Sequence, residues 1–306
     1  MNPHLTKNRG YGKSRSLLIV TSAYVMALAG AVISHWYMDG LSPLWAGLAM
    51  DIVATIIIWA IGAYVSNASL YDPYWSVIPP ALALYWIGST GGGLTTGQTL
   101  VLIVIFFWAF RLTTNWARDW PGLEHEDWRY QEMRANNPKT YLLVSNLMGI
   151  NIFPTMLVFL GMLPVYVIMT GDGTSNRVID YVAAVIGIGA ALIQFVSDEQ
   201  MRNFRKKQRN NETNEAFYTG GLWAWSRHPN YFGEVLMWFS LWLFALSAGG
   251  MAYAWTAIGW VAMLALFLFA SCPWMDRRSA AKRAGYAEHM ENSNLFFMTP
   301  PRKKKT

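Results

Sequence analysis

Long apolar segments constrain this 306-residue sequence more than any other feature. A helix needs about 20 apolar residues to cross a hydrocarbon core about 30 Å thick. The sequence predicts an all-α, polytopic integral membrane protein with about eight transmembrane helices. We divide it into an N-terminal part with three of these helices, residues 1–98, and a membrane domain, residues 99–306, with cytoplasmic loops 111–145 and 198–229. The eight apolar segments lie at about 17–38, 44–66, 74–90, 99–115, 146–169, 178–197, 230–247 and 251–272.

The distribution of charge agrees with this topology and predicts an orientation. Only 14% of the residues are charged, whereas soluble domains contain about a quarter. If eight helices span the membrane, only Arg177 among the 24 Lys and Arg residues falls on the side away from the termini. The positive-inside rule then places both termini in the cytoplasm. We expect the lysines at Lys303–Lys305 to contact anionic membrane lipids, so the basic charge does not indicate nucleic acid as a partner.

A basic segment follows the sixth apolar run. If that helix continues beyond the membrane, Asp198, Arg202 and Arg205 share one face at positions i, i+4 and i+7. Two arginines one turn apart favour phosphate, because a guanidinium binds phosphate oxygens bidentately and keeps its charge. The alternative is a solvated helix end that follows the positive-inside rule.

The segment "SRHPNYFGE" at 226–234 begins the seventh apolar run. Pro229 is typical of the first turn of a helix, so Asn230 and Glu234 lie one turn apart on one face. A carboxylate in an apolar helix is costly, which makes Glu234 a candidate functional residue with Arg227 and His228 at the mouth of the site. The alternative is that Glu234 is hydrogen-bonded to a neighbouring helix.

Two stretches together resemble a known family. "SDEQMRNFR" at 197–205 and "GLWAWSRHPNYFGE" at 221–234 are similar to the C-terminal domain of steroid 5-alpha-reductases. The similarity is strongest to their uncharacterised bacterial members, which share the "EDWRY" element found here at 126–130. The resemblance implies a reductase of the bacterial inner membrane that holds NADPH in a pocket open to the cytoplasm. By position, the implied cofactor-binding residues are Gln194, Asp198, Arg202, Arg205, Arg227, His228, Asn230, Glu234 and Tyr286.

The implied reaction transfers a hydride to the β-carbon of a hydrophobic conjugated alkene, a steroid-, sterol- or isoprenoid-like enone. Negative charge develops on the carbonyl oxygen, so a hydrogen-bond donor must face it. The steroid enzymes use a Glu–Tyr pair on the two spans before the basic loop, whereas this sequence has Trp108 in its fourth span and no tyrosine there. Asp72, Tyr74 and Glu234 are therefore the candidate catalytic residues. Alternatively, Tyr74 is an interfacial aromatic residue and Asp72 caps the third helix.

The polar stretch 118–134 has two interpretations. Its "EHED" at 124–127 has the composition of a metal cluster but lacks the i, i+4 histidine spacing of an HExxH site, so we predict no metal. We expect Asp119, Glu126, Asp127 and Arg129 to make local pairs that shape a lid over the cofactor pocket.

Two other functional classes fit parts of the sequence. Membrane methyltransferases of the isoprenylcysteine type bind S-adenosylmethionine and also carry an "RHP-x-Y-x-G" element. They follow it with paired glutamates near the end of the last span, where this sequence has Met275 and Asp276. The third class is a non-catalytic, lipid-binding membrane protein. In each class the expected partners are membrane lipids and a hydrophobic small-molecule or lipid ligand.

Overall fold

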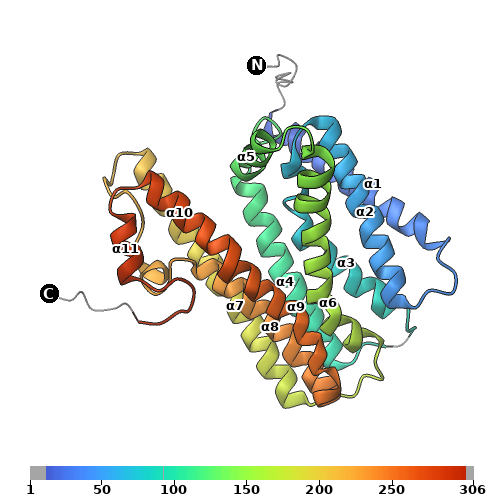
Figure 1. Ribbon diagram of the computed structural model, residues 1–306. Helices are drawn as coiled ribbons and strands as arrows, with labels where there is room; N and C mark the ends of the chain where they lie inside the picture. Colours follow the sequence, from blue (N-terminus) through green and yellow to red (C-terminus); the bar gives the residue numbers. More distant parts are fainter. Residues whose placement is uncertain (1–11, 92, 301–306) are drawn as a thin grey trace. The chain divides into compact units, whose positions relative to one another are not determined.

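The computed structural model describes residues 12–91 and 93–300, and these residues form helices and no strand (Figure 1). The predicted all-α fold is therefore confirmed for this part of the chain. The first half contains α1 (Lys13–His35), α2 (Pro43–Val65), η1 (Ala68–Tyr71), α3 (Tyr74–Gly88), α4 (Thr96–Asp119), α5 (Trp128–Asn136) and the π-helical η2 (Tyr141–Ile152). The second half contains α6 (Phe153–Thr170), α7 (Arg177–Arg209), η3 (Gly221–Ala224), α8 (Pro229–Gly249), η4 (Gly250–Ala257), α9 (Ile258–Leu266), η5 (Phe267–Ser271), α10 (Cys272–Lys282) and α11 (Tyr286–Asn292).

The apolar runs of the sequence form helices that are long enough to make this a multi-pass membrane protein. Within the described residues, six helical stretches have the length and composition to cross a membrane. They are Lys13–His35, Pro43–Val65, Thr96–Asp119, Tyr141–Thr170, Arg177–Arg209 and Pro229–Lys282. The predicted third span, α3, has only 15 residues. The last stretch has 54 residues and includes α8 and α9, which pack against each other.

The chain divides into two compact units whose boundaries differ from the predicted division at 98/99. Unit 1 comprises Met1–Gly93 and Leu112–Met162, and unit 2 comprises Leu94–Arg111 and Leu163–Thr306. The difference arises because segment 112–162 makes its contacts with the N-terminal helices. Its Thr155 hydroxyl, for example, bonds the hydroxyls of Thr55 (2.8 Å) and Tyr71 (2.7 Å).

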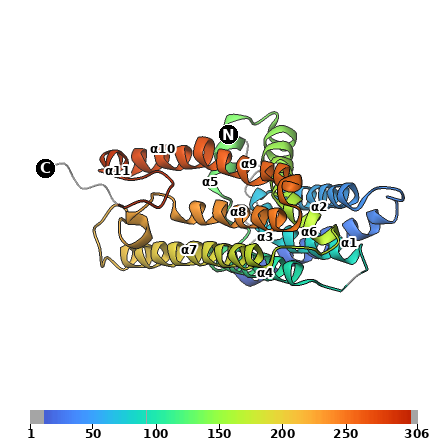
Figure 2. The same ribbon diagram turned by 90° about the horizontal axis from the view of Figure 1, so that it is seen from below.

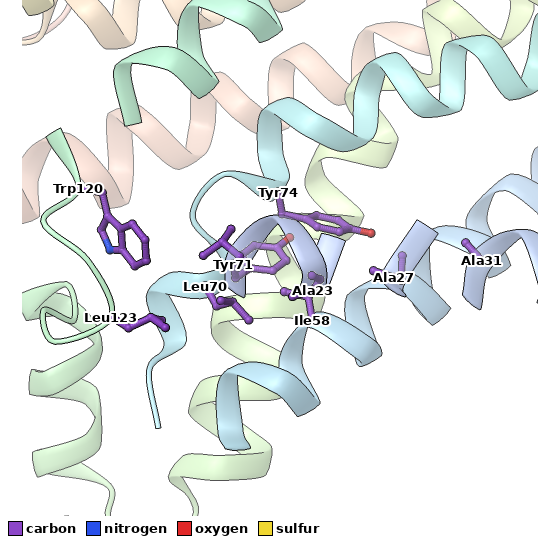
Figure 3. Close-up of a cluster of buried hydrophobic side chains, with 11 residues drawn as sticks. Ala23, Ala27, Ala31, Ile58, Leu70, Tyr71, Tyr74, Trp120 and Leu123 are labelled. Atoms are coloured by element: carbon purple, nitrogen blue, oxygen red, sulfur yellow. The ribbon is translucent and has the colours of Figure 1, made fainter. Parts of the chain in front are cut away.

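The core of unit 1 forms where α1 packs against α2. Small residues at every fourth position of α1, Ala23, Ala27 and Ala31, are buried in this contact and allow the helices to approach closely. Figure 3 shows the rings of Tyr71 and Tyr74 lying together in the same cluster, with centroids 5.0 Å apart and nearly parallel planes. Two phenol hydroxyls are thus held inside an otherwise apolar core.

The core of unit 2 is built on α7 and α8, which lie side by side in both views (Figures 1 and 2). Glycine makes this contact possible: a Cβ at Gly233 would lie 2.8 Å from the carbonyl oxygen of Ala190. A Cβ at Gly187 would lie 2.7 Å from the hydroxyl oxygen of Ser240. The close approach brings the polar residues of α7 next to those at the start of α8.

Candidate functional site

Unit 2 contains all of the predicted cofactor-binding residues, and α7 and α8 position several of them. α7 continues without a break to Arg209, so Asp198 and the arginines that follow it share one helical face as predicted. The Asp198 carboxylate bonds Arg111 of α4 at 2.9 Å and accepts a longer hydrogen bond of 3.4 Å from Asn230. Arg202, one turn further along α7, pairs with Glu199. The cluster joins three helices through one carboxylate.

Glu234 accepts a hydrogen bond from an indole on each of its carboxylate oxygens. Trp108 of α4 donates from Nε1 at 3.0 Å, and Trp238 of α8 donates at 2.9 Å. The two indole rings meet edge to face with centroids 5.4 Å apart. The alternative interpretation of Glu234, a bond to a neighbouring helix, is therefore observed. The ionised Glu234 carboxylate can only accept hydrogen bonds, so a ligand could bind to it only by donating to one of its remaining lone pairs.

Gln194 is the predicted cofactor residue with unused hydrogen-bonding capacity. Its side chain is 1% exposed, and neither its amide oxygen nor its amide nitrogen has a hydrogen-bond partner. It lies against the Gly233 notch, where a Cβ would approach its Cγ to 2.7 Å. Leaving a buried amide without partners costs about 1–3 kcal/mol. The site therefore suits a ligand group that both donates and accepts.

Arg227, His228 and Tyr286, predicted to bind the cofactor, converge on one acid. Asp276 of α10 accepts from Arg227 Nε at 2.9 Å and from the Tyr286 hydroxyl at 2.9 Å, and it bonds His228 Nε2 at 3.0 Å. Burial and the neighbouring carboxylate raise the pKa of Tyr286, so the phenol keeps its proton. In this arrangement the three residues hold a carboxylate of the chain itself.

Arg227 also holds the end of α11 and the residues that follow it. Its Nη1 donates to the carbonyl oxygens of Met290 (2.9 Å) and Ser293 (2.7 Å), and its backbone N–H donates to that of Asn294 (2.9 Å). Arg227, Phe297 and Leu268 line a cavity of about 480 Å³ beside this segment, within the size range of small-molecule sites. The C-terminal network therefore fixes one wall of a largely apolar cavity.

Unit 1 contains the predicted catalytic residue Tyr74, and its hydroxyl has a partner that the sequence analysis missed. Tyr74 donates to Oδ1 of Asp51 at 2.7 Å, and the two residues come from α3 and α2. Asp51 is completely buried, and its Oδ2 has no hydrogen-bond partner. An acid–tyrosine pair with unused acceptor capacity therefore lies inside the apolar core of unit 1.

Asp72, the predicted partner of Tyr74, is bonded elsewhere. Its Oδ1 accepts from the hydroxyl of Tyr130 at 2.6 Å. The prediction that Asp72 caps the third helix is wrong, because the N-cap of α3 is Pro73 and no side chain bonds the end of the helix. Burial raises the pKa of Asp72 to about 7.

Asp51 was not identified from the sequence, and Asp276 was placed at the position of the methyltransferase glutamates without a partner. Both are acids within or at the end of an apolar run, and the argument that drew attention to Glu234 applies equally to them. Asp51 stands inside "LAMDIVA" at 48–54. The missing information was their partners, since Tyr74 and Arg227 are 23 and 49 residues away in the sequence.

Comparison with known proteins places the chain in a family. Residues 58–293, most of the chain, match the family described as "Protein of unknown function (DUF1295)". The chain belongs to the DUF1295 family. The matched range of this DUF1295 protein starts after Asp51 and includes all residues that the sequence analysis assigned to the site.

A curated relative and the solved structures complete the comparison. The chain is 24% identical over 277 residues to "Uncharacterized protein C594.04c" of Schizosaccharomyces pombe (strain 972 / ATCC 24843). That alignment covers 84% of this DUF1295 chain and 80% of the yeast protein. No solved structure matches the chain.

Proposed function

We propose that this DUF1295 protein is a membrane-embedded, NADPH-dependent reductase of a hydrophobic conjugated alkene such as a steroid-, sterol- or isoprenoid-like enone. The observation that carries the proposal is the buried Tyr74–Asp51 pair of unit 1. It supplies the acid–tyrosine donor that reduction of an enone requires. The similarity of segments 197–205 and 221–234 to steroid 5-alpha-reductases supports the same reaction class.

The donor pair has a defined task in this reaction. The Tyr74 hydroxyl donates a hydrogen bond to the substrate carbonyl oxygen, where negative charge develops, and gives its proton to that oxygen as the hydride adds to the β-carbon. The resulting enol tautomerises to the saturated ketone. Asp51 in its protonated form donates to the Tyr74 oxygen in turn and replaces the proton that the phenol gives up. The surrounding apolar core excludes water, and hydrogen bonds to a developing charge are strongest in such surroundings.

Unit 2 supplies the residues suited to the nucleotide. Arg202 and Arg205 would hold its phosphates, and Gln194 would bond a group that carries both a donor and an acceptor. When bound, NADPH supplies the hydride. Asn230 and Asp198 offer further polar contacts beside it. The orphaned amide of Gln194 is the feature that best fits a bound cofactor.

We extend the proposal to topology and location. Counting the short α3, and dividing Pro229–Lys282 between α8 and the helices after it, gives eight spans with both termini on the basic face. This arrangement places the start of α8 and the end of α7 in the cytoplasm, where NADPH is available. The compartment that fits is the bacterial inner membrane.

Asp276 favours a second candidate function. An S-adenosylmethionine-dependent membrane methyltransferase would need an acid beside its "RHP" element, and Asp276 lies there with Arg227 and His228. The methyltransferases pair their "RHP" element with two glutamates, whereas here it is bonded to the single acid Asp276. A non-catalytic lipid-binding protein is the third candidate, favoured by the apolar cavity near Phe297.

Nucleotide binding by the purified protein in detergent separates these candidates. We expect NADPH to bind more tightly than NADH, and Arg205→Ala to weaken NADPH binding about tenfold, because one charged hydrogen-bonding group contributes roughly 1.5–3 kcal/mol. Lys207→Ala is the matched control, since Lys207 is exposed on the opposite face of the same helix end. Binding of S-adenosylmethionine without NADPH would favour the methyltransferase, and binding of neither would favour the lipid-binding protein.

A further inference from the structure

Two distant segments of unit 1 run alongside each other just before Tyr74. The first segment is 67–72, which contains η1, and the second is 123–130, which ends in the "EDWRY" element. Four hydrogen bonds between them join residues 58 positions apart, so the segments run in parallel and in constant register. Asn67 Nδ2 donates to the carbonyl oxygens of His125 (3.2 Å) and, two residues earlier, Leu123 (2.8 Å). The other three bonds at this spacing are Ala68 N to Glu126 Oε1 (2.8 Å), Asp127 N to Ser69 Oγ (2.9 Å) and Tyr130 Oη to Asp72 Oδ1 (2.6 Å).

The last of these bonds lies next to the proposed donor. Asp72 is two residues before Tyr74, and Tyr74 is the first residue of α3. The chain between them is short and contains Pro73, whose ring restricts φ. A shift of the backbone at Asp72 would therefore displace the first residue of α3, which carries the Tyr74 hydroxyl.

We propose that Tyr130 and Asp72 are positioning residues that hold the Tyr74 hydroxyl against Asp51. The proposal rests on the proposed function, because positioning the Tyr74 hydroxyl matters for turnover only if Tyr74 is the hydrogen-bond donor to the substrate. It also assigns a different task to Asp72, which the sequence analysis placed in the chemistry itself. The "EDWRY" element then fixes the donor-bearing segment of unit 1.

The local pairs predicted in this region support a rigid segment. Glu126 bonds Arg134 at 2.8 Å as well as the Ala68 amide, and Asp127 bonds Arg129 at 2.9 Å. Side chains fixed at both ends lose little further freedom when they position a third group.

The ionisable surroundings of Asp72 give the proposal a second, pH-dependent readout. Tyr130 and Arg129 face it from α5, Asp127 from the N-cap of α5, and Tyr24 from α1. Burial raises the pKa of Asp72 from 3.8 to about 7. Because the folded-state pKa is the higher one, the contribution of Asp72 to stability is complete at low pH and is lost as the pH rises towards 7. Burial also raises the pKa of Tyr130, so the phenol donates throughout this range.

The test compares variants of the full-length protein in detergent, with NADPH and a 4-en-3-one steroid as the probe substrate. Tyr130→Phe and Asp72→Ala should each lower kcat about tenfold or more with little change in the KM for NADPH, because a small displacement of a reacting group costs that much. Asp72→Asn keeps an acceptor for Tyr130 and should recover most of the turnover lost in Asp72→Ala. It should also flatten the fall in Tm between pH 5 and pH 8. Tyr37→Phe, which alters an exposed tyrosine, is the control.

Amide hydrogen exchange over residues 67–75 keeps the inference testable if a variant or the substrate fails. Tyr130→Phe should raise exchange in this segment more than Tyr37→Phe does. An unchanged kcat in Tyr130→Phe would overturn the inference if Tyr74→Phe is inactive. If both Tyr130→Phe and Tyr74→Phe keep wild-type turnover, the proposed donor role of Tyr74 is itself overturned. If the wild-type protein reduces no enone, unchanged exchange at 67–75 in Tyr130→Phe overturns the positioning role alone.

Discussion

Two buried carboxylates, one in each unit, differ in how completely they are satisfied. Asp276 in unit 2 is bonded on both oxygens, by Arg227 on one and by His228 and Tyr286 on the other. Asp51 in unit 1 is bonded on Oδ1 alone, and its buried Oδ2 has no partner. A fully bonded carboxylate stabilises the structure it belongs to, whereas an underused one retains capacity for a ligand or a proton.

A side chain whose hydrogen bonds are already made within the chain is a weaker candidate for binding a ligand than one with unused capacity. Arg227 and His228 carry the most recognisable element of the sequence, "RHPNYFGE", yet their contacts are with Asp276 and the C-terminal segment. Tyr74 and Asp51 belong to no motif that the sequence analysis identified. The unsatisfied polar atoms at Asp51 and Gln194 are therefore better guides to a binding site than the motif alone.

The largest effect should come from breaking the Asp276 network. Arg227→Ala leaves a buried carboxylate without its charged partner, which costs about 3–5 kcal/mol. It also releases the segment after α11, so we expect a large fall in Tm in detergent and proteolysis near Ser293. Arg277→Ala, at an exposed arginine next to Asp276, should change stability by less than about 0.5 kcal/mol. Equal Tm values for the two variants would show that the network is dispensable.

A much smaller effect on stability should follow from neutralising Asp51. Asp51→Asn keeps an acceptor for the Tyr74 hydroxyl and removes an ionisable group from an apolar helix. The free energy of unfolding should therefore fall by no more than about 1 kcal/mol, or rise, and Tm should change little. Turnover should fall, because the amide cannot pass a proton to Tyr74. A loss of stability as large as that of Arg227→Ala would show that Asp51, like Asp276, is a structural acid.

Much of the architecture could be predicted from the sequence. Apolar length alone predicts the long helices that form the six candidate spans, and Pro229 marks the first residue of α8 as expected. The continuation of α7 to Arg209 follows from helical periodicity in the same way. These are local properties, which depend on residues within a few turns of each other.

The site was less predictable because its contacts are distant in sequence. Tyr74 is close in sequence to Asp72 but bonds Asp51, and Asp72 bonds Tyr130, 58 residues away. Asp198 bonds Arg111 of α4, 87 residues away. In each case the choice of partner depends on how helices pack, which spacing along one helix does not encode.

The most direct test of the proposed reductase follows a label from cofactor to product. The purified protein is given NADPH deuterated at C4 of the nicotinamide and a 4-en-3-one steroid, and the product is analysed by mass spectrometry and NMR. The account predicts a saturated ketone with deuterium at the former β-carbon. Transfer should be strongly reduced in Tyr74→Phe and retained in Lys207→Ala. An NADPH-bound protein that transfers no deuterium to any enone of this class, or wild-type transfer by Tyr74→Phe, would contradict the account.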